Sequence, residues 1–253
     1  MRQAVSRSAK KKLRSRFLFL IILFLAVMQL TFLAVFFARS DKRKIELPAE
    51  EVVAIRVHQA GDYRDFSLTI EESGPGYSLK YSGLVKDGMM YGTLESFDLQ
   101  VFSYYDMYYV RGGDVFNEWQ TVEKAELQAL AAFVRNPLPL LSRLLAEEYF
   151  SVESGPDRLI EGVPCQAFLL DVSPSASLLG SLFSVLQEDD VLLEQMRVYI
   201  WFGTEDNFLY KMALLFDIVT TKEKVQVTRV YSMNRQQAYL PDDLPLGNKT
   251  LEI

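Results

Sequence analysis

The chain has 253 residues and a formal net charge of −6, which is the sum of two unequal parts. Residues 1–44 carry eleven Lys and Arg against Asp41 alone, whereas residues 45–253 carry sixteen against thirty-two Asp and Glu. The acidic part disfavours nucleic acid as a partner because like charges repel. A single Cys excludes an intrachain disulfide, and a single His excludes a multi-histidine metal site.

The first feature in chain order is an uncharged apolar segment at residues 17–38, FLFLIILFLAVMQLTFLAVFFA. As a helix rising about 1.5 Å per residue it would be about 33 Å long, enough to cross a hydrocarbon core of about 30 Å. A buried helix of a soluble protein would show a polar face, and this segment has none. The segment therefore predicts a transmembrane helix.

Several features indicate that this helix is an uncleaved anchor. The apolar run is longer than the apolar region of a signal peptide. A cleavage site after Ala38 would place Phe36 where a small residue is required. No Cys directly follows the run, which excludes lipid attachment of the bacterial lipoprotein type.

The flanking charges predict the orientation and the domain organisation. Seven Lys and Arg precede the apolar segment and four follow it, which favours a cytoplasmic N-terminus. We expect a cytoplasmic basic segment at 1–16, a single-pass anchor in the cell membrane at 17–38, a juxtamembrane linker at 39–47 and an extracytoplasmic domain at 48–253. Attraction to anionic lipids explains the basic cluster better than nucleic-acid binding or nuclear targeting does.

The extracytoplasmic part begins with a segment at 48–60 whose Pro and following acids suit a first helical turn, although its β-branched residues weaken that prediction. A two-residue period then indicates short antiparallel strands separated by turns. The predicted strands cover 66–71, 78–81, 89–96, 97–105, 107–111, 118–122, 149–153, 158–161, 165–171, 197–202, 208–219 and 224–231.

Two helical interruptions divide these strands. Residues 124–146 are rich in helix formers, with a break at Asn136-Pro137 before a stripe of Leu at helical spacing. Residues 174–196 predict a pair of helices, or one helix broken near Gly180 or near the acids that follow. The fold class is therefore α+β, with a large curved antiparallel sheet and helices on one face. A doubly wound α/β fold is disfavoured because the strands follow one another directly.

Four stretches carry a resemblance to a known family. They are YYDMYYVRGG at 104–113 with NEW at 117–119, NPLPLLSRLL at 136–145, EGVPCQAFLLDV at 161–172 and VYIWFGTEDNFLYKMALLF at 198–216. In these stretches and in the order of its elements, the chain resembles the LolA/LppX-like superfamily of bacterial envelope lipid and lipoprotein carriers.

The resemblance implies an incomplete β-barrel whose concave, apolar face is covered by helices, with acyl chains bound between them. It also implies a protein that is not an enzyme, and we expect no cofactor and no metal. The chain departs from the lipoprotein members because it lacks the acylated Cys and has a predicted transmembrane helix in its place. That difference puts shuttling between membranes in doubt.

The candidate ligand-binding residues are the apolar positions that would face such a groove. On the strands and on the covering helices they are Phe97, Leu99, Val101, Leu138, Leu141, Leu144, Leu169, Leu179, Phe183, Leu186, Met212, Leu214 and Phe216. The same stripes are typical of a close-packed core. The sequence therefore leaves two hypotheses open: a lipid or acyl binder, and a membrane-tethered structural domain with a solid core that binds other envelope proteins.

Other chemistry-bearing residues are explained more simply by structural roles. His58 has no Ser or Cys nucleophile motif nearby, so catalysis is not expected. Cys165 opens an apolar strand and is expected to be a buried, inert thiol. The acidic runs at 188–190 and 242–243 lack the spacing of a calcium-binding loop.

Overall fold

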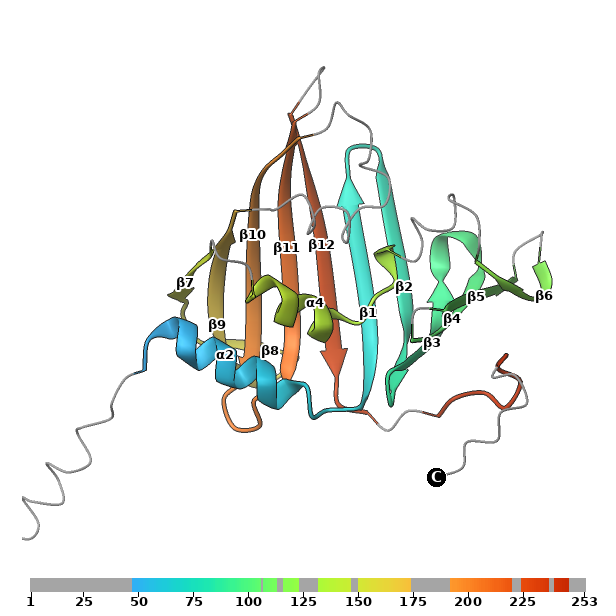
Figure 1. The fold of residues 1–253 in the computed structure, drawn as a ribbon, viewed down its shortest axis with the longest axis horizontal. Helices are drawn as coiled ribbons and strands as arrows, with labels where there is room; N and C mark the ends of the chain where they lie inside the picture. Colours follow the sequence, from blue (N-terminus) through green and yellow to red (C-terminus); the bar gives the residue numbers. More distant parts are fainter. Residues whose placement is uncertain are drawn as a thin grey trace, which may run out of the picture. The chain divides into compact units, whose positions relative to one another are not determined.

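The computed structural model describes residues 47–105, 107–112, 116–122, 132–146, 150–173, 192–219, 224–236 and 239–245. Over these residues the chain forms one twelve-stranded antiparallel sheet with two α-helices (Figure 1). The predicted segments at 1–16 and 17–38 and nearly all of the predicted linker lie outside them. Within the described ranges, no helix is long and apolar enough to cross a membrane.

The elements follow one another with few helices between strands. In chain order they are α2 (Ala49–Ala60), β1 (Asp65–Gly74), β2 (Tyr77–Lys86), β3 (Met89–Leu94), the 3₁₀ turn η1 (Glu95–Phe97), β4 (Leu99–Tyr104), β5 (Met107–Gly112), β6 (Phe116–Thr121), α4 (Pro137–Leu144), β7 (Phe150–Ser154), β8 (Arg158–Ile160), β9 (Val163–Val172), β10 (Leu192–Gly203), β11 (Leu209–Val219) and β12 (Lys224–Asn234).

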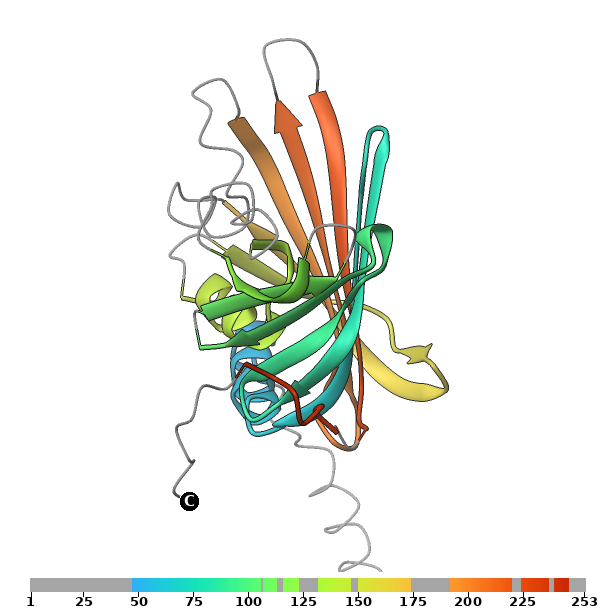
Figure 2. The same ribbon diagram turned by 90° about the vertical axis from the view of Figure 1, so that its right-hand side faces the viewer.

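The sheet consists of two meanders, β1–β6 and β7–β12, which are joined by the pairing of β1 with β12. Its strand order is β6-β5-β4-β3-β2-β1-β12-β11-β10-β9-β7, with β8 paired to β9. Every pairing in the described sheet is antiparallel, which confirms the predicted topology. Figure 2 shows that the sheet bends, so that β3–β6 turn towards the side on which the helices lie.

One face of the sheet is apolar and is covered by both helices. In β1, Phe66, Leu68 and Ile70 alternate with partly exposed or exposed polar residues and are at most 1% exposed. Because the side chains of a strand alternate between faces, these three share one face with their cross-strand partners. The helices α2 and α4 contribute Val53 and Leu141 to the same core, on the concave side of the bend (Figures 1 and 2).

Both helices have identifiable start signals and anchors. The side chain of Asn136 caps α4 by accepting a hydrogen bond of 3.0 Å from the Leu138 backbone N–H, with Pro137 in the first turn. On α2, Arg56 donates a hydrogen bond of 2.8 Å to Gln166 on β9 and lies 5.7 Å from the centre of the Phe168 ring. The cap defines the start of α4, and the Arg56 contacts hold α2 against β9.

A pair of glycines makes room for a buried aromatic ring. Gly83 and Gly92 lie opposite each other on β2 and β3, and Tyr81 is fully buried beside them. A Cβ built on Gly92 would lie 2.4 Å from the Ser82 carbonyl oxygen and 2.7 Å from the Tyr81 ring. The ring therefore occupies the space that side chains would fill at either glycine.

Several predicted boundaries differ from the structure, and at two places the type of element is also different. Phe97 is in η1, not in a strand, because Asp98 adopts a left-handed conformation (φ 48°) that ends the turn before β4 begins at Leu99. The last five residues of the predicted helical segment 174–196 are not helical, because they form the start of β10. Met196 pairs there with Val172 and Phe216. The rest of that segment, 174–191, lies outside the described residues.

The glycine pair yields a stability prediction. We expect Gly92→Ala to lower the free energy of unfolding by about 3 kcal/mol or more, because neither the backbone nor the packed Tyr81 ring can move aside freely. Gly162→Ala is the control: its Cβ would meet nothing within 4 Å, so only its positive φ of 86° carries a cost, about 1 kcal/mol. Urea denaturation measures both, and equal effects would contradict the steric explanation.

Candidate functional site

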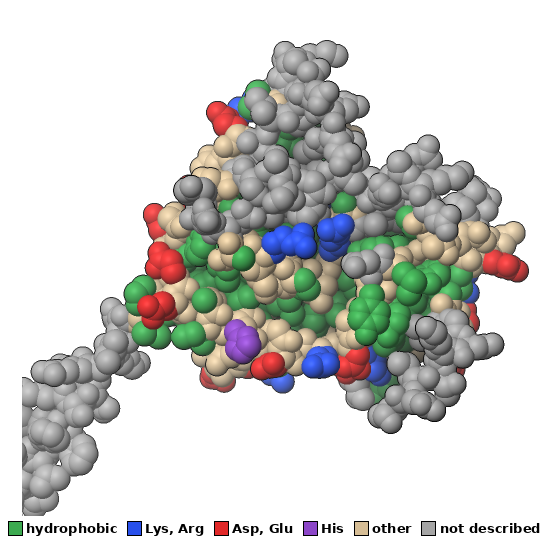
Figure 3. All heavy atoms as spheres, viewed as in Figure 1, with side chains coloured by type: hydrophobic (Ala, Val, Ile, Leu, Met, Phe, Trp, Pro, Cys, Tyr) green, Lys and Arg blue, Asp and Glu red, His purple; other side chains and the backbone are tan. Residues whose placement is uncertain are grey.

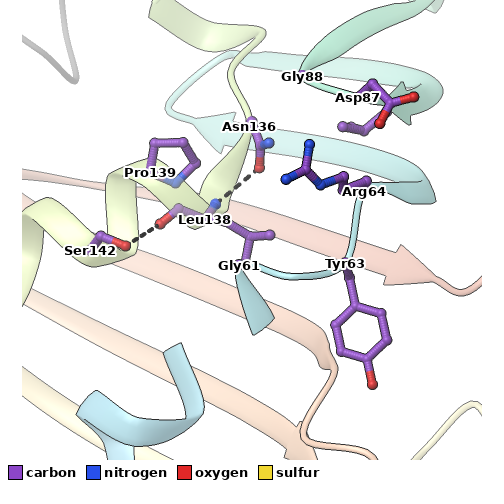
Figure 4. A pocket seen from close by; sticks show the side chains of 10 residues that line it. Gly61, Tyr63, Arg64, Asp87, Gly88, Asn136, Leu138, Pro139 and Ser142 are labelled. Atoms are coloured by element: carbon purple, nitrogen blue, oxygen red, sulfur yellow. Dashed lines mark hydrogen bonds between the residues drawn. The ribbon is translucent and has the colours of Figure 1, made fainter. Parts of the chain in front are cut away.

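A pocket opens at one end of the helix-covered face, between the end of α2, the β2–β3 turn and the start of α4 (Figure 4). Its volume is about 340 Å³, at the lower end of the range for small-molecule sites. Its lining comes from three separate parts of the chain: Gly61, Tyr63 and Arg64; Val85, Asp87 and Gly88; and Asn136, Leu138, Pro139 and Ser142. The pocket thus combines an apolar wall with a polar mouth.

The local structure of each part explains its position. Asp87 and Gly88 both have positive φ, 48° and 81°, which gives the tight turn between β2 and β3. The Asp87 backbone N–H donates to the Arg64 carbonyl oxygen at 3.1 Å, so the turn is tied to the start of β1. The apolar wall is formed by Val85 and Leu138, which are 1% and 7% exposed and belong to the core.

A second set of hydrogen bonds, centred on Asp206, connects the pocket residue Tyr63 to the β10–β11 turn. The Tyr63 hydroxyl donates to the Asp206 carbonyl oxygen at 2.7 Å, and the Asp206 carboxylate accepts from the Phe208 N–H, the Tyr210 hydroxyl and Arg235. Partial burial alone would raise the pKa of Asp206, but these donors outweigh it and the net shift is downward. Burial and the adjacent carboxylate raise the pKa of Tyr210 to about 12.

A buried ion pair lies on the same face of the sheet, at the junction of β1 and β12. Arg229 Nε donates to a Glu72 carboxylate oxygen at 2.5 Å, and the two residues are 2% and 7% exposed. The Tyr77 hydroxyl donates to the other oxygen at 3.1 Å, and Arg229 also donates to the Ala132 carbonyl oxygen at 3.3 Å. The pair links the sheet to the segment that precedes α4.

Most of the predicted groove residues within the described ranges are packed into the core. Those that are at most 7% exposed are Val101, Leu138, Leu141, Leu144, Met212, Leu214 and Phe216. Leu99 is partly buried against them. Only Leu138 of this set lines the pocket. Whether any of them contacts a ligand stays a prediction.

The remaining predicted residues lie elsewhere. Leu169 pairs with Tyr199, whereas its neighbours Phe168 and Leu170 pair with the buried Ile200 and Val198, so Leu169 is on the face that the helices do not cover. Phe97 is 60% exposed in η1. Leu179, Phe183 and Leu186 lie outside the described residues.

The other chemistry-bearing residues that the structure describes do not form a second site, and the acids at 188–190 lie outside the described residues. His58 is exposed on α2, and Asp243 pairs with Arg111 at 2.6 Å. Cys165 is fully buried as predicted, and burial raises the pKa of its thiol. In the part of the chain that the structure describes, no group of three or more His, Cys, Asp or Glu side chains could hold a metal ion.

An open, curved antiparallel sheet with helices packed on its concave face is the architecture of the LolA/LppX-like fold, and the chain has this fold. Among solved structures it is similar to the lipoprotein LppX of Mycobacterium tuberculosis, with a TM-score of 0.50 at 9% identity over 76% of this chain and 98% of that chain. It is also similar to LprF of Mycobacterium bovis, with a TM-score of 0.46 at 10% identity over 76% and 94%. No family model and no curated protein matches the sequence.

The Asp206 contacts predict a pH dependence. A carboxylate whose pKa is lower in the folded than in the unfolded chain stabilises the fold above the unfolded pKa of about 4, and this contribution is lost as the pH falls through the folded value. We expect Asp206→Asn to destabilise the protein at pH 7 and to flatten the loss of stability below about pH 4. Urea denaturation from pH 7 to pH 2.5 measures this, with the exposed Asp62→Asn as control. An unchanged acid slope in Asp206→Asn would contradict it.

The buried ion pair predicts a non-additive response. Arg229→Met would leave the Glu72 carboxylate buried without its cation and should cost about 3–5 kcal/mol, much of which Glu72→Met should restore in the double variant. The exposed pair Lys80–Glu95, at 43% and 45% exposure, provides the control, and Lys80→Met should cost less than about 1 kcal/mol. A similar cost for Arg229→Met and Lys80→Met would refute a structural role for the buried pair.

Proposed function

We propose that the chain is a membrane-anchored, non-catalytic envelope protein that binds a lipid or another acylated ligand, with its acyl part in the pocket between α4, the end of α2 and the β2–β3 turn. The observation that carries this proposal is the continuity of the pocket with the apolar concave face, since Val85 and Leu138 belong to both. Figure 3 shows hydrophobic side chains at the surface of this face around a small basic area.

The energetics favour an apolar ligand segment in such a pocket. Each methylene removed from water contributes about 0.8 kcal/mol, and the apolar wall is already formed before the ligand binds. The volume of about 340 Å³ suits one acyl segment or one small amphiphile and not several long chains. The LolA/LppX-like fold is consistent with this function, and the binding itself is inferred from the pocket.

The location of the protein is part of the proposal. The apolar segment at 17–38 would anchor the chain in the cell membrane with its N-terminus in the cytoplasm, and the sheet domain would be extracytoplasmic. A domain tethered in this way could bind or transfer lipid near its own membrane, but it could not carry lipid away from it.

One observation favours a second function, that of a structural domain which binds other envelope proteins. Leu141, Leu144, Met212, Leu214 and Phe216 are all fully buried, so the middle of the concave face is filled by its own side chains. A solid core of this kind would present only its surface to partners. The two functions differ in whether an acyl chain enters the pocket.

Labelling with a photoreactive acyl chain tests the proposal directly. We expect a fatty acid that carries a diazirine in its chain to label the intact protein at the peptide containing Leu138 and Ser142, as mapped by mass spectrometry. Ser142 is exposed at the pocket, so Ser142→Trp should fill the space without disturbing the core and should reduce labelling at least about fivefold.

The matched control places the same bulk on the same helix outside the pocket. Arg143 is exposed and does not line the pocket, so Arg143→Trp should leave labelling unchanged. Labelling that is absent from this peptide in the wild-type chain, or that Ser142→Trp does not reduce, would exclude acyl binding at the pocket and favour the structural domain.

A further inference from the structure

The mouth of the pocket contains a cation that the described residues leave without a counter-ion. Arg64 lines the pocket, and its guanidinium points towards Asn136 across the mouth (Figure 4). Among the described residues no carboxylate lies within 4.0 Å of it, whereas Arg111, Arg229 and Arg235 each have such a partner. An arginine that is directed into a cavity and has no carboxylate within ion-pair distance is available to bind an anion there.

A second donor lies on the opposite side of the mouth. The Oδ1 atom of Asn136 accepts from the Leu138 N–H, which identifies the other atom of the amide as the nitrogen, a donor. The described residues provide no acceptor for this nitrogen. The mouth therefore presents two hydrogen-bond donors, one of them charged, at the N-terminal end of α4, where the helix dipole also favours negative charge.

Among the described residues that line the pocket, the one opposing charge is that of Asp87, which is exposed on its turn. Arg64 is exposed as well, so solvent screens both charges, and the difference between them is that Arg64 and Asn136 can donate hydrogen bonds directly to a bound anion whereas Asp87 cannot. The wall below the mouth is formed by Val85 and Leu138. Donors above an apolar wall match a ligand with an oxyanion at the end of an acyl chain.

From this arrangement we infer that the pocket is specific for anionic amphiphiles, with Arg64 and Asn136 binding a carboxylate or phosphate head group and the chain directed along Val85 and Leu138. This inference rests on the proposed function, because it names the class of ligand that the acyl pocket takes. A free fatty acid and a phospholipid could both supply such an oxyanion. Their head groups are distinguished below.

Competition against the photoreactive label on the intact chain tests the head-group specificity. The competitors are dodecanoate, its uncharged methyl ester and dodecyl phosphate, which share one chain length. On the wild-type protein the two anions should compete at least about tenfold more strongly than the ester, as expected for a hydrogen bond to a charged group. Whichever anion competes more strongly identifies the source, a fatty acid or a phospholipid.

Three variants assign the effect to the mouth. Arg64→Gln should remove the preference for anions and leave competition by the ester unchanged, and Arg64→Lys should restore part of the preference. Arg143→Gln removes a positive charge from the surface of α4 outside the pocket and should have no effect. Asp87→Asn suits the left-handed backbone and should strengthen anion competition about two- to fivefold.

The outcomes separate this inference from the proposed function. If all three competitors displace the label equally, or if Arg64→Gln keeps the anion preference, acyl binding stands and the head-group inference is overturned. If Asp87→Asn weakens anion competition, Asp87 does not act as the opposing charge at the mouth and the inference is also overturned. If the wild-type chain is not labelled at the pocket, the proposed function itself fails.

Discussion

The pairing of β1 with β12 is the interaction on which the rest of the structure depends, because it alone joins the two meanders into one sheet. It aligns residues 67–73 with residues 228–234, far apart in the chain. Its register places Ile70 opposite Tyr231 and Glu72 opposite Arg229, all of them buried on the helix-covered face. A slip by one residue would move this whole set to the other face and separate the two charges. The buried ion pair thus fixes the register of β1 against β12, the two paired strands that lie farthest apart in the sequence.

The pairing of β1 with β12 also positions the concave face and part of the pocket. Once β1 lies beside β12, the connection from α2 to β1 is held next to the β10–β11 turn, and Tyr63 reaches the Asp206 carbonyl oxygen. That contact fixes the chain immediately before Arg64. The hydrogen bond from the Asp87 backbone N–H to the Arg64 carbonyl oxygen then fixes the β2–β3 turn. The Tyr63 contact therefore depends on the pairing of the two meanders, whereas the Asp87 contact continues the pairing of β1 with β2 and needs only that hairpin.

The sequence predicted the strands well where a polar residue alternates with an apolar one, as in β1, and less well where both faces are apolar. Phe168, Leu169 and Leu170 form an unbroken apolar run, so periodicity could not assign Leu169 to its face. The start of β10 has leucines and a methionine at spacings that also suit a helix. The pocket was missed because Arg64, Asp87 and Asn136 are polar loop residues whose proximity depends on tertiary structure. Asn136 was interpreted as part of a helix break, and its role as the cap of α4 is the one signal that could have located the site.

For the proposed acyl ligand, the packed core and the pocket would set different limits. Lifting α4 would expose Leu138, Leu141 and Leu144, at a cost of about 1.5–3 kcal/mol for each side chain. At about 0.8 kcal/mol per methylene, a chain must bury on the order of ten methylenes to offset that cost. A shorter chain gains more by remaining in the preformed pocket, where no helix has to move. Under the proposed function, chain length would therefore decide whether the helix-covered face behaves as a solid core with a pocket at its end or as a groove that a long acyl chain can open.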